Sequence, residues 1–185
     1  MSERWPMVKN KLESKWSESY RATPNVFWGM KLQNNMLAHT VTPADFLIHF
    51  ERKTISLTGA KVTQLFSNLV EAKQVTCEPG ENGRLAFKRL KQMHDLLSFE
   101  SFSNYHRGFF LVGFIENKWD NSEVYLVPVK ALHYYIDHCV MASINRETFK
   151  ICFHEYLLSY EKGLLDASQI TRSTPWNVPQ ENNTL

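Results

Sequence analysis

The stretch Leu69-Val70-Glu71-Ala72-Lys73-Gln74-Val75 decides how this chain is interpreted. Its composition predicts a short strand over residues 69–75. In a strand, side chains two residues apart point to the same face, so Glu71 and Lys73 lie together while Ala72 faces the other way. Such a pair is often a surface ion pair of little energetic value. It is also half of a metal-dependent nuclease site, and the rest of the sequence must separate these interpretations.

The composition is that of an ordinary globular chain. With 185 residues, 43% of them hydrophobic, we expect a single domain over residues 1–170 and a flexible tail over 171–185. The net charge of +2 is too small to indicate a nucleic-acid partner, so any basic patch must be local. Three cysteines without C-x-x-C spacing fit a reducing compartment. Without a signal-peptide pattern or an apolar run long enough for a bilayer, we expect a cytoplasmic protein and no membrane.

Periodicity predicts the elements of the N-terminal half. Apolar residues at spacing four predict a helix over 7–20, ended by residues 23–25. Residues 26–28 are expected as a strand or a buried turn, and residues 46–50 as a strand. The connection over 51–68 is either a longer hairpin or a small inserted hairpin, with Gly59 marking a turn.

The C-terminal half alternates helices and strands. Residues 78–83 are expected as a loop, and Ala86, Leu90, Met93 and Leu97 predict an amphipathic helix over 84–97. A continuous apolar run predicts a central buried strand over 109–115, joined by a turn over 117–122 to a hairpin partner over 123–129. Helices are expected over 130–142 and around 146–160. This order predicts an α/β fold with a mixed sheet flanked by helices.

Three residues supply the chemistry of phosphodiester hydrolysis. Mg²⁺ binds hard oxygen ligands, a metal-bound water can be activated, and a lysine can stabilise the developing negative charge. Asp45 opens one strand, while Glu71 and Lys73 share a face of the next long strand. If these strands pair, the two carboxylates can share a metal. Spacing alone favours the plainer interpretation, in which Asp45 caps a turn and Glu71–Lys73 is a surface ion pair.

A second Glu-x-Lys occurs at Glu51-Arg52-Lys53. Glu51 lies six residues after Asp45, which is about 20 Å along one strand, too far for a shared metal. We therefore prefer Glu71 and Lys73.

An ordered series of motifs resembles a known superfamily. Pro-Ala-Asp-Phe-Leu-Ile (43–48), Leu-Val-Glu-Ala-Lys-Gln (69–74), the Phe87-x-x-Leu90-x-Gln92 segment, Gly-Phe-Phe-Leu-Val-Gly-Phe (108–114) and Val-Tyr-Leu-Val-Pro (124–128) follow one another. The series, over roughly residues 25–135, resembles the PD-(D/E)xK nucleases, and within them the RecU type of Holliday junction resolvase with its phage-encoded relatives. It implies a restriction-endonuclease-like fold and favours the nuclease site over the surface ion pair.

The resemblance also implies roles for individual residues. Asp45, Glu71 and the backbone carbonyl of Ala72 would bind Mg²⁺ or Mn²⁺. Lys73 would be the catalytic lysine, and Gln92, matching a helix glutamine of the family, would support it or contact the phosphate. Family members often add an acidic residue from the first helix. Glu13 and Glu18 are the candidates, at most one can serve, and we favour Glu18.

The sequence departs from the family pattern in two ways. The 26-residue gap between Asp45 and Glu71 is longer than the usual simple hairpin, and the first-helix acidic residue has no clear match.

Basic residues near Gln92 are candidates for DNA phosphate contacts: Arg84, Lys88, Arg89 and Lys91. Lys53 and Lys61 form either a DNA-contacting projection or, as we favour, an ordinary loop.

The first hypothesis is therefore a Mg²⁺- or Mn²⁺-dependent Holliday junction resolvase. It would act on branched or duplex DNA as a homodimer in a bacterial or phage-infected cytoplasm, since paired nicks favour two-fold symmetry. The alternatives are a restriction- or repair-type nuclease of the same superfamily and a non-catalytic DNA-binding module.

Overall fold

A five-stranded mixed sheet forms the centre of the protein. The structure, a computed structural model, describes residues 11–32, 42–55, 58–78 and 81–172. The strand order is β1-β2-β3-β5-β6, and only β3 and β5 run parallel to each other. The strands are β1 Val26–Lys31, β2 Phe46–Ile55, β3 Lys61–Thr76, β5 His106–Ile115 and β6 Glu123–Pro128.

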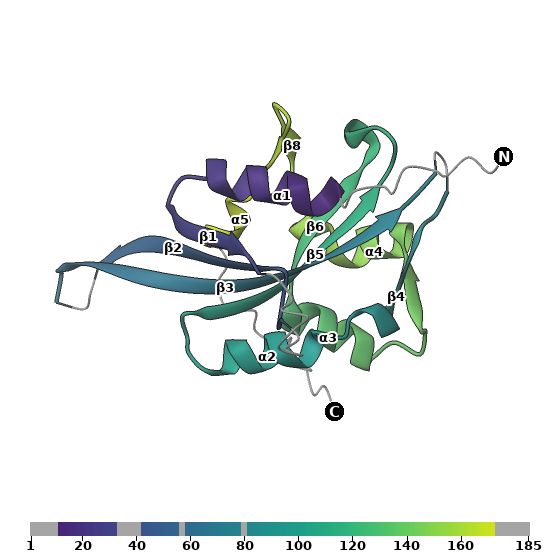
Figure 1. The fold of residues 1–185 in the computed structure, drawn as a ribbon. Coiled ribbons are helices and arrows are strands. Elements are labelled where there is room, and N and C mark those ends of the chain that lie inside the picture. The colour runs from purple at the N-terminus through teal and green to yellow at the C-terminus, as the bar shows by residue number, and fades with distance from the viewer. Residues whose placement is uncertain (1–10, 33–41, 56–57, 79–80, 173–185) are drawn as a thin grey trace, which may run out of the picture.

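Helices cover both faces of this sheet (Figure 1). Helix α1 (Lys11–Ala22) packs on one face, and α2 (Met93–Ser101) and α3 (Val129–Asp137) pack on the other. Helix α4 (Arg146–Phe153) extends the second layer. The predicted α/β fold with a mixed sheet flanked by helices is therefore confirmed.

Helix α1 follows from the spacing of its apolar residues. Leu12, Trp16 and Tyr20 recur every four residues and are all fully buried against the sheet. The chain leaves the helix through Asn25, whose φ of 68° lies in the left-handed region that asparagine tolerates. The helix predicted over 7–20 is confirmed where the structure describes it, and residues 7–10 lie outside that part.

The connection between Asp45 and Glu71 is one long hairpin. Strands β2 and β3 pair from Phe46↔Val70 to Ile55↔Lys61, and Gly59 at the turn has a φ of +79°. The outer half of the hairpin projects away from the body as an arm (Figure 1). Of the two alternatives for residues 51–68, the longer hairpin is correct. The strands predicted at 46–50 and 69–75 are its inner ends.

The helix predicted over 84–97 is wrong in its first half. Residues Arg84–Ala86 form strand β4, which pairs with β7 (Ser143–Asn145), and a 3-10 helix follows at Phe87–Arg89. The α-helix begins at Met93 and continues to Ser101. The reason is tertiary, because Leu85 is fully buried opposite Ile144 in the β4–β7 pair. Of the apolar residues that suggested the helix, only Met93 and Leu97 lie in α2.

The remaining predictions are mostly confirmed with shorter bounds. Strands β5 and β6 form the predicted hairpin, and a 3-10 helix at Trp119–Asn121 occupies the predicted turn. Residues 26–28 are a strand, with Phe27 69% exposed rather than in a buried turn. The predicted C-terminal helices shorten to α3 and α4. Short elements follow: β8 Tyr160–Glu161, β9 Leu164–Leu165 and α5 Gln169–Arg172. Residues 173–185 of the expected tail lie outside the described part.

Within the described residues, the helices are too short or too polar for any of them to cross a membrane.

The β4 segment gives a direct test of this arrangement. Leu85→Ala should lower the free energy of unfolding by about 2–5 kcal/mol, because a fully buried side chain is lost from the core. Lys88→Ala, an exposed change three residues away, should stay within about 0.5 kcal/mol. Urea denaturation of both variants measures the difference. Equal effects would contradict a buried β4.

Candidate functional site

Strand pairing places Asp45 beside Glu71. Asp45 immediately precedes β2, whose first residue, Phe46, pairs with Val70 of β3. One step further along the register, Asp45 is opposite Glu71. Asp45 Oδ2 accepts a hydrogen bond from the backbone N–H of Ala72 at 2.8 Å. The Asp45 carboxylate is therefore held beside Ala72, between Glu71 and Lys73 in the sequence.

Lys73 links Glu71 to Gln92. Lys73 Nζ lies 2.5 Å from Glu71 Oε1 and 3.3 Å from Gln92 Oε1. Gln92 occupies the N-cap position of α2. The predicted helix from residue 84 had placed it in the helix interior. The structure thus brings together all four of the residues predicted to be catalytic. The competing Glu51 is exposed in the arm, opposite Leu65, and lies apart from them.

The Glu71–Lys73 pair is not a surface ion pair. The side chains of Glu71 and Lys73 are only 4% and 13% exposed. Burial and the negative charge of Asp45 raise the pKa of Glu71, the hydrogen bond and charge of Lys73 lower it, and the net result is a pKa of about 7. Burial also raises the pKa of Asp45, against the lowering effect of its hydrogen bond from Ala72. Two carboxyl groups therefore share one poorly solvated position.

The donor atoms at this position fit a hard divalent cation. In an extended strand the N–H and C=O of one residue point to the same side, so the Ala72 carbonyl points to the edge where its N–H meets Asp45. Two carboxylates and one carbonyl are oxygen ligands of the kind that Mg²⁺ and Mn²⁺ bind. The described residues contain no group of three or more His, Cys, Asp or Glu side chains that could hold a metal. Water or phosphate oxygens would complete the coordination, as is usual for Mg²⁺.

The first helix contributes Glu13 to the electrostatics of this site. The Glu13 side chain is 15% exposed, forms an ion pair with Lys31 of β1, and raises the pKa of Asp45 through its charge. Glu18, which the sequence favoured, is 58% exposed and forms an ion pair with Lys15 at 2.9 Å. Of the two candidates, the structure therefore places Glu13 near Asp45.

The predicted DNA-contacting residues do not share one helix face. Arg84 lies in β4, Lys88 and Arg89 in the 3-10 helix, and Lys91 just before α2. All four are exposed, and Arg89 donates a hydrogen bond to the Gln74 carbonyl at 3.1 Å. Arg89 therefore reaches the strand that carries Glu71 and Lys73. Lys53 and Lys61 are exposed on the hairpin arm.

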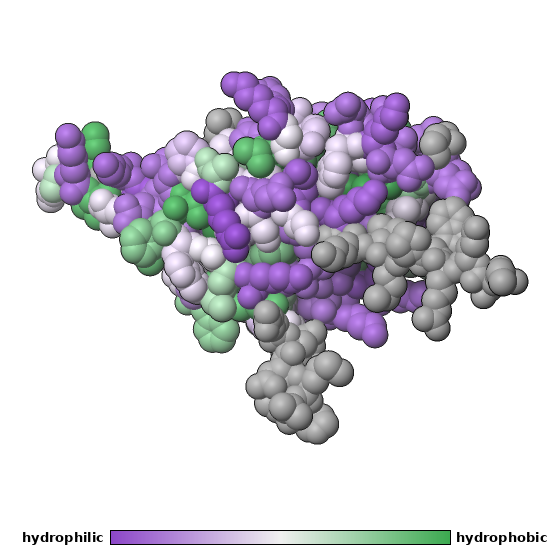
Figure 2. Space-filling view, turned by 45° about the horizontal axis from the view of Figure 1, so that its top comes forward, coloured by the Kyte–Doolittle hydropathy of each residue, from purple (hydrophilic) through white to green (hydrophobic). Residues whose placement is uncertain are grey.

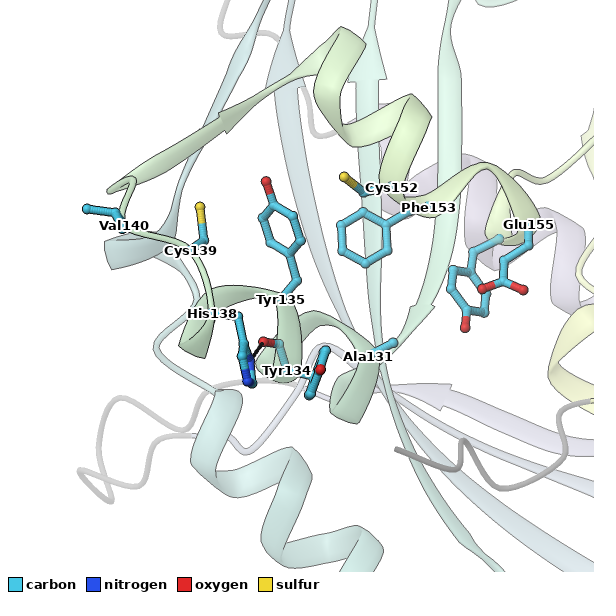
Figure 3. A pocket seen from close by; sticks show the side chains of 10 residues that line it. Ala131, Tyr134, Tyr135, His138, Cys139, Val140, Cys152, Phe153 and Glu155 are labelled. Carbon is cyan, nitrogen blue, oxygen red and sulfur yellow. Dashed lines mark hydrogen bonds between the residues drawn. The ribbon is translucent and has the colours of Figure 1, made fainter. Parts of the chain in front are cut away.

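A separate groove of about 560 Å³ lies between α3 and the end of α4 (Figure 3). Its lining is largely aromatic and includes Tyr134, Tyr135 and Phe153. His138 borders it and makes a 2.8 Å hydrogen bond through Nδ1 to the carbonyl of Tyr134. None of the four predicted catalytic residues lines this groove. The groove therefore adds nothing to the carboxylate site.

No protein-family model matches the chain, and no curated protein matches it.

The buried Glu71 carboxylate should cost the protein stability. With a pKa raised from 4.5 to about 7, the folded state binds a proton more tightly than the unfolded state, so stability falls as pH rises through this window. In EDTA, Glu71→Gln should be more stable than the wild type by about 2–3 kcal/mol at pH 8 and by less than about 1 kcal/mol at pH 5. Urea denaturation at both pH values measures this difference.

The exposed Glu51→Gln serves as its control and should change stability by less than about 0.5 kcal/mol at either pH. A wild type more stable than Glu71→Gln at pH 8 would contradict the raised pKa.

The two first-helix carboxylates can be separated by metal affinity. Glu13→Gln removes a negative charge that acts on Asp45 and leaves Lys31 without this partner, so Mg²⁺ affinity should fall about fivefold. Glu18→Gln should leave the affinity within about twofold, because Glu18 pairs with Lys15. Isothermal titration calorimetry at pH 8 measures both. A larger loss in Glu18→Gln would restore Glu18 as the candidate ligand.

Proposed function

We propose that this chain is a metal-dependent, structure-selective DNA endonuclease of the Holliday junction resolvase kind, with a restriction-endonuclease-like fold. One observation carries the proposal. Asp45 binds the Ala72 N–H beside Glu71, and the Glu71 carboxylate is paired with Lys73, which also contacts Gln92. The order of motifs in the sequence supports the same function.

Each residue then has a defined task. Asp45, Glu71 and the Ala72 carbonyl would hold Mg²⁺ or Mn²⁺, which supplies a Lewis acid and lowers the pKa of a bound water. The Lys73 ammonium stabilises negative charge that develops on the phosphate, and Gln92 Oε1 orients it by accepting a hydrogen bond. With a pKa of about 7, Glu71 holds a proton for part of the time at neutral pH, and it would serve as a metal ligand only in its ionised form.

The surroundings of the site offer contacts for DNA phosphates. Lys88, Arg89 and Lys91 are exposed close in sequence to Gln92. The arm carries exposed Lys53 and Lys61 at the far end of the same hairpin. Figure 2 shows hydrophilic and apolar groups mixed along this projecting arm. In the proposed complex these cations contact the backbone without reading its sequence.

A junction resolvase cuts two strands symmetrically. The economical arrangement is a two-fold homodimer that presents one site to each strand. The proposal therefore includes a homodimer acting in a bacterial or phage-infected cytoplasm.

Cleavage of a four-way junction with Mg²⁺ tests the function. Asp45→Ala and Glu71→Ala should lose cleavage, and Lys73→Ala should lower the rate by about 100-fold or more, because each removes a group assigned to the transition state. Lys150→Ala is the matched lysine control, since Lys150 pairs with Glu123 at 3.0 Å outside the site. Initial rates on labelled junctions, with and without Mg²⁺, measure the effects.

The choice of DNA substrate in this experiment separates the alternative functions. Faster cleavage of linear duplex than of a junction of the same sequence would replace the resolvase with a restriction- or repair-type nuclease. Full activity in Asp45→Ala or Glu71→Ala would overturn the nuclease site. DNA binding without calorimetrically detectable Mg²⁺ binding would indicate a non-catalytic module.

A further inference from the structure

Four side chains form a row across four neighbouring strands. The register pairs Trp28 with His49, His49 with Ser67, and Ser67 with His106. Residues directly opposite one another in a sheet point to the same face, so these four side chains lie side by side. We call Trp28, His49, Ser67 and His106 the Trp–His row.

Contacts within the row fix its geometry. The Trp28 indole stacks on the His49 ring, with centroids 5.4 Å apart and planes 25° apart. His49 Nδ1 and Ser67 Oγ are hydrogen-bonded at 2.8 Å. His106 Nδ1 is hydrogen-bonded to the Phe99 carbonyl, and its ring stacks on that of Phe99. Trp28 is nevertheless 45% exposed, so His49 covers only part of an indole that is held in place.

The Trp–His row lies on the same face of the sheet as Glu71 and Lys73, which we call the catalytic pair. Ser67 and Glu71 are four residues apart on β3, so both point to one face at a separation of about 13 Å. Lys53 lies four residues beyond His49 on β2, on the same face and further out along the arm. The row therefore stands between the catalytic pair and a cation of the arm. A separation of about 13 Å is the rise of about four nucleotides along one strand of a duplex.

This arrangement provides both groups that hold a nucleotide. An exposed, immobilised indole stacks on a base with little loss of side-chain entropy, and such stacking is tolerant of sequence. When the Ser67 hydroxyl donates to His49 Nδ1, the Nε2–H of His49 is left to donate to a phosphate oxygen. A single exposed tryptophan is ordinary on a protein surface. A tryptophan held by a hydrogen-bonded histidine on the catalytic face is a more specific feature.

We propose that the Trp–His row is a nucleotide subsite, in which Trp28 stacks on a base that has a free face and His49 donates to its backbone phosphate. The inference rests on the proposed function, because the row acquires this role from its place on the catalytic face. A base inside an intact duplex is stacked on both of its neighbours and has no free face for the indole. The row therefore selects DNA in which a base near the cleaved phosphate is not stacked on both sides.

Binding in EDTA tests the subsite without cleavage. Fluorescence anisotropy of the full chain with a labelled 12-nucleotide thymidine strand should show an affinity about tenfold lower for Trp28→Ala, and Trp28→Phe should recover most of the loss. His49→Gln should weaken binding severalfold. Trp119→Ala and His154→Gln are the matched controls, because Trp119 stacks on Tyr160 and His154 is exposed at the end of α4, both outside the row. Both controls should bind within about twofold of the wild type.

A duplex of the same length completes the design. The wild type should prefer the single strand, and Trp28→Ala should lose this preference; thermal melts confirm that each variant is folded. Wild-type affinity in Trp28→Ala, or an equal loss in Trp119→Ala, overturns the subsite. If Trp28→Ala binds DNA with wild-type affinity and cleavage still requires Asp45, the proposed subsite is wrong and the proposed nuclease function is supported. Trp28-dependent binding by a chain that cleaves no DNA supports the subsite and overturns the nuclease.

Discussion

The hydrogen bond from the Ala72 N–H to Asp45 Oδ2 is the contact on which the site depends. Strand β2 begins at Phe46, so beyond Val70 the β3 backbone has no β2 partner. A buried amide without a partner is costly, and the Asp45 carboxylate provides the acceptor that a continuing β2 would have supplied. The same contact holds that carboxylate beside Glu71. The end of the strand pairing and the position of the carboxyl pair are therefore one structural feature.

Burial distinguishes this pair from an ordinary ion pair. The fold keeps the carboxyl groups of Asp45 and Glu71 close together in a poorly solvated place, with Lys73 as the nearby cation, and burial raises the pKa of both groups. Such an arrangement disfavours the charged state that a simple ion pair would need. A carboxyl group with a strongly raised pKa beside a fixed lysine, as at Glu71, is typical of functional sites. The proposal of metal-dependent chemistry depends on this burial and not on the Glu-x-Lys spacing by itself.

The fold was predictable where local pattern and tertiary packing agree. The spacing of Leu12, Trp16 and Tyr20 predicts α1, and the apolar run of β5 predicts a strand buried on both faces. The pattern failed in the first half of 84–97, because strand β4 is formed by pairing with β7, about 60 residues later in the chain. No local periodicity carries that information. The short strands β8 and β9 also went unpredicted, and they too are brief segments without a periodic pattern.

The arrangement of the candidate site residues was predictable for a related reason. Side-chain alternation along β3 places Glu71 and Lys73 on one face, and the start of β2 places Asp45 opposite them, whatever the length of the loop between. The sequence offered Glu13 and Glu18 and favoured Glu18, because the approach of Glu13 to Asp45 depends on how α1 packs on the sheet. The 26-residue gap suggested a departure from the expected geometry. In an antiparallel hairpin, however, residues added in pairs near the turn extend both strands equally and leave the inner register unchanged. The separation of Asp45 and Glu71 in sequence therefore measures the length of the arm and not the distance between the carboxyl groups.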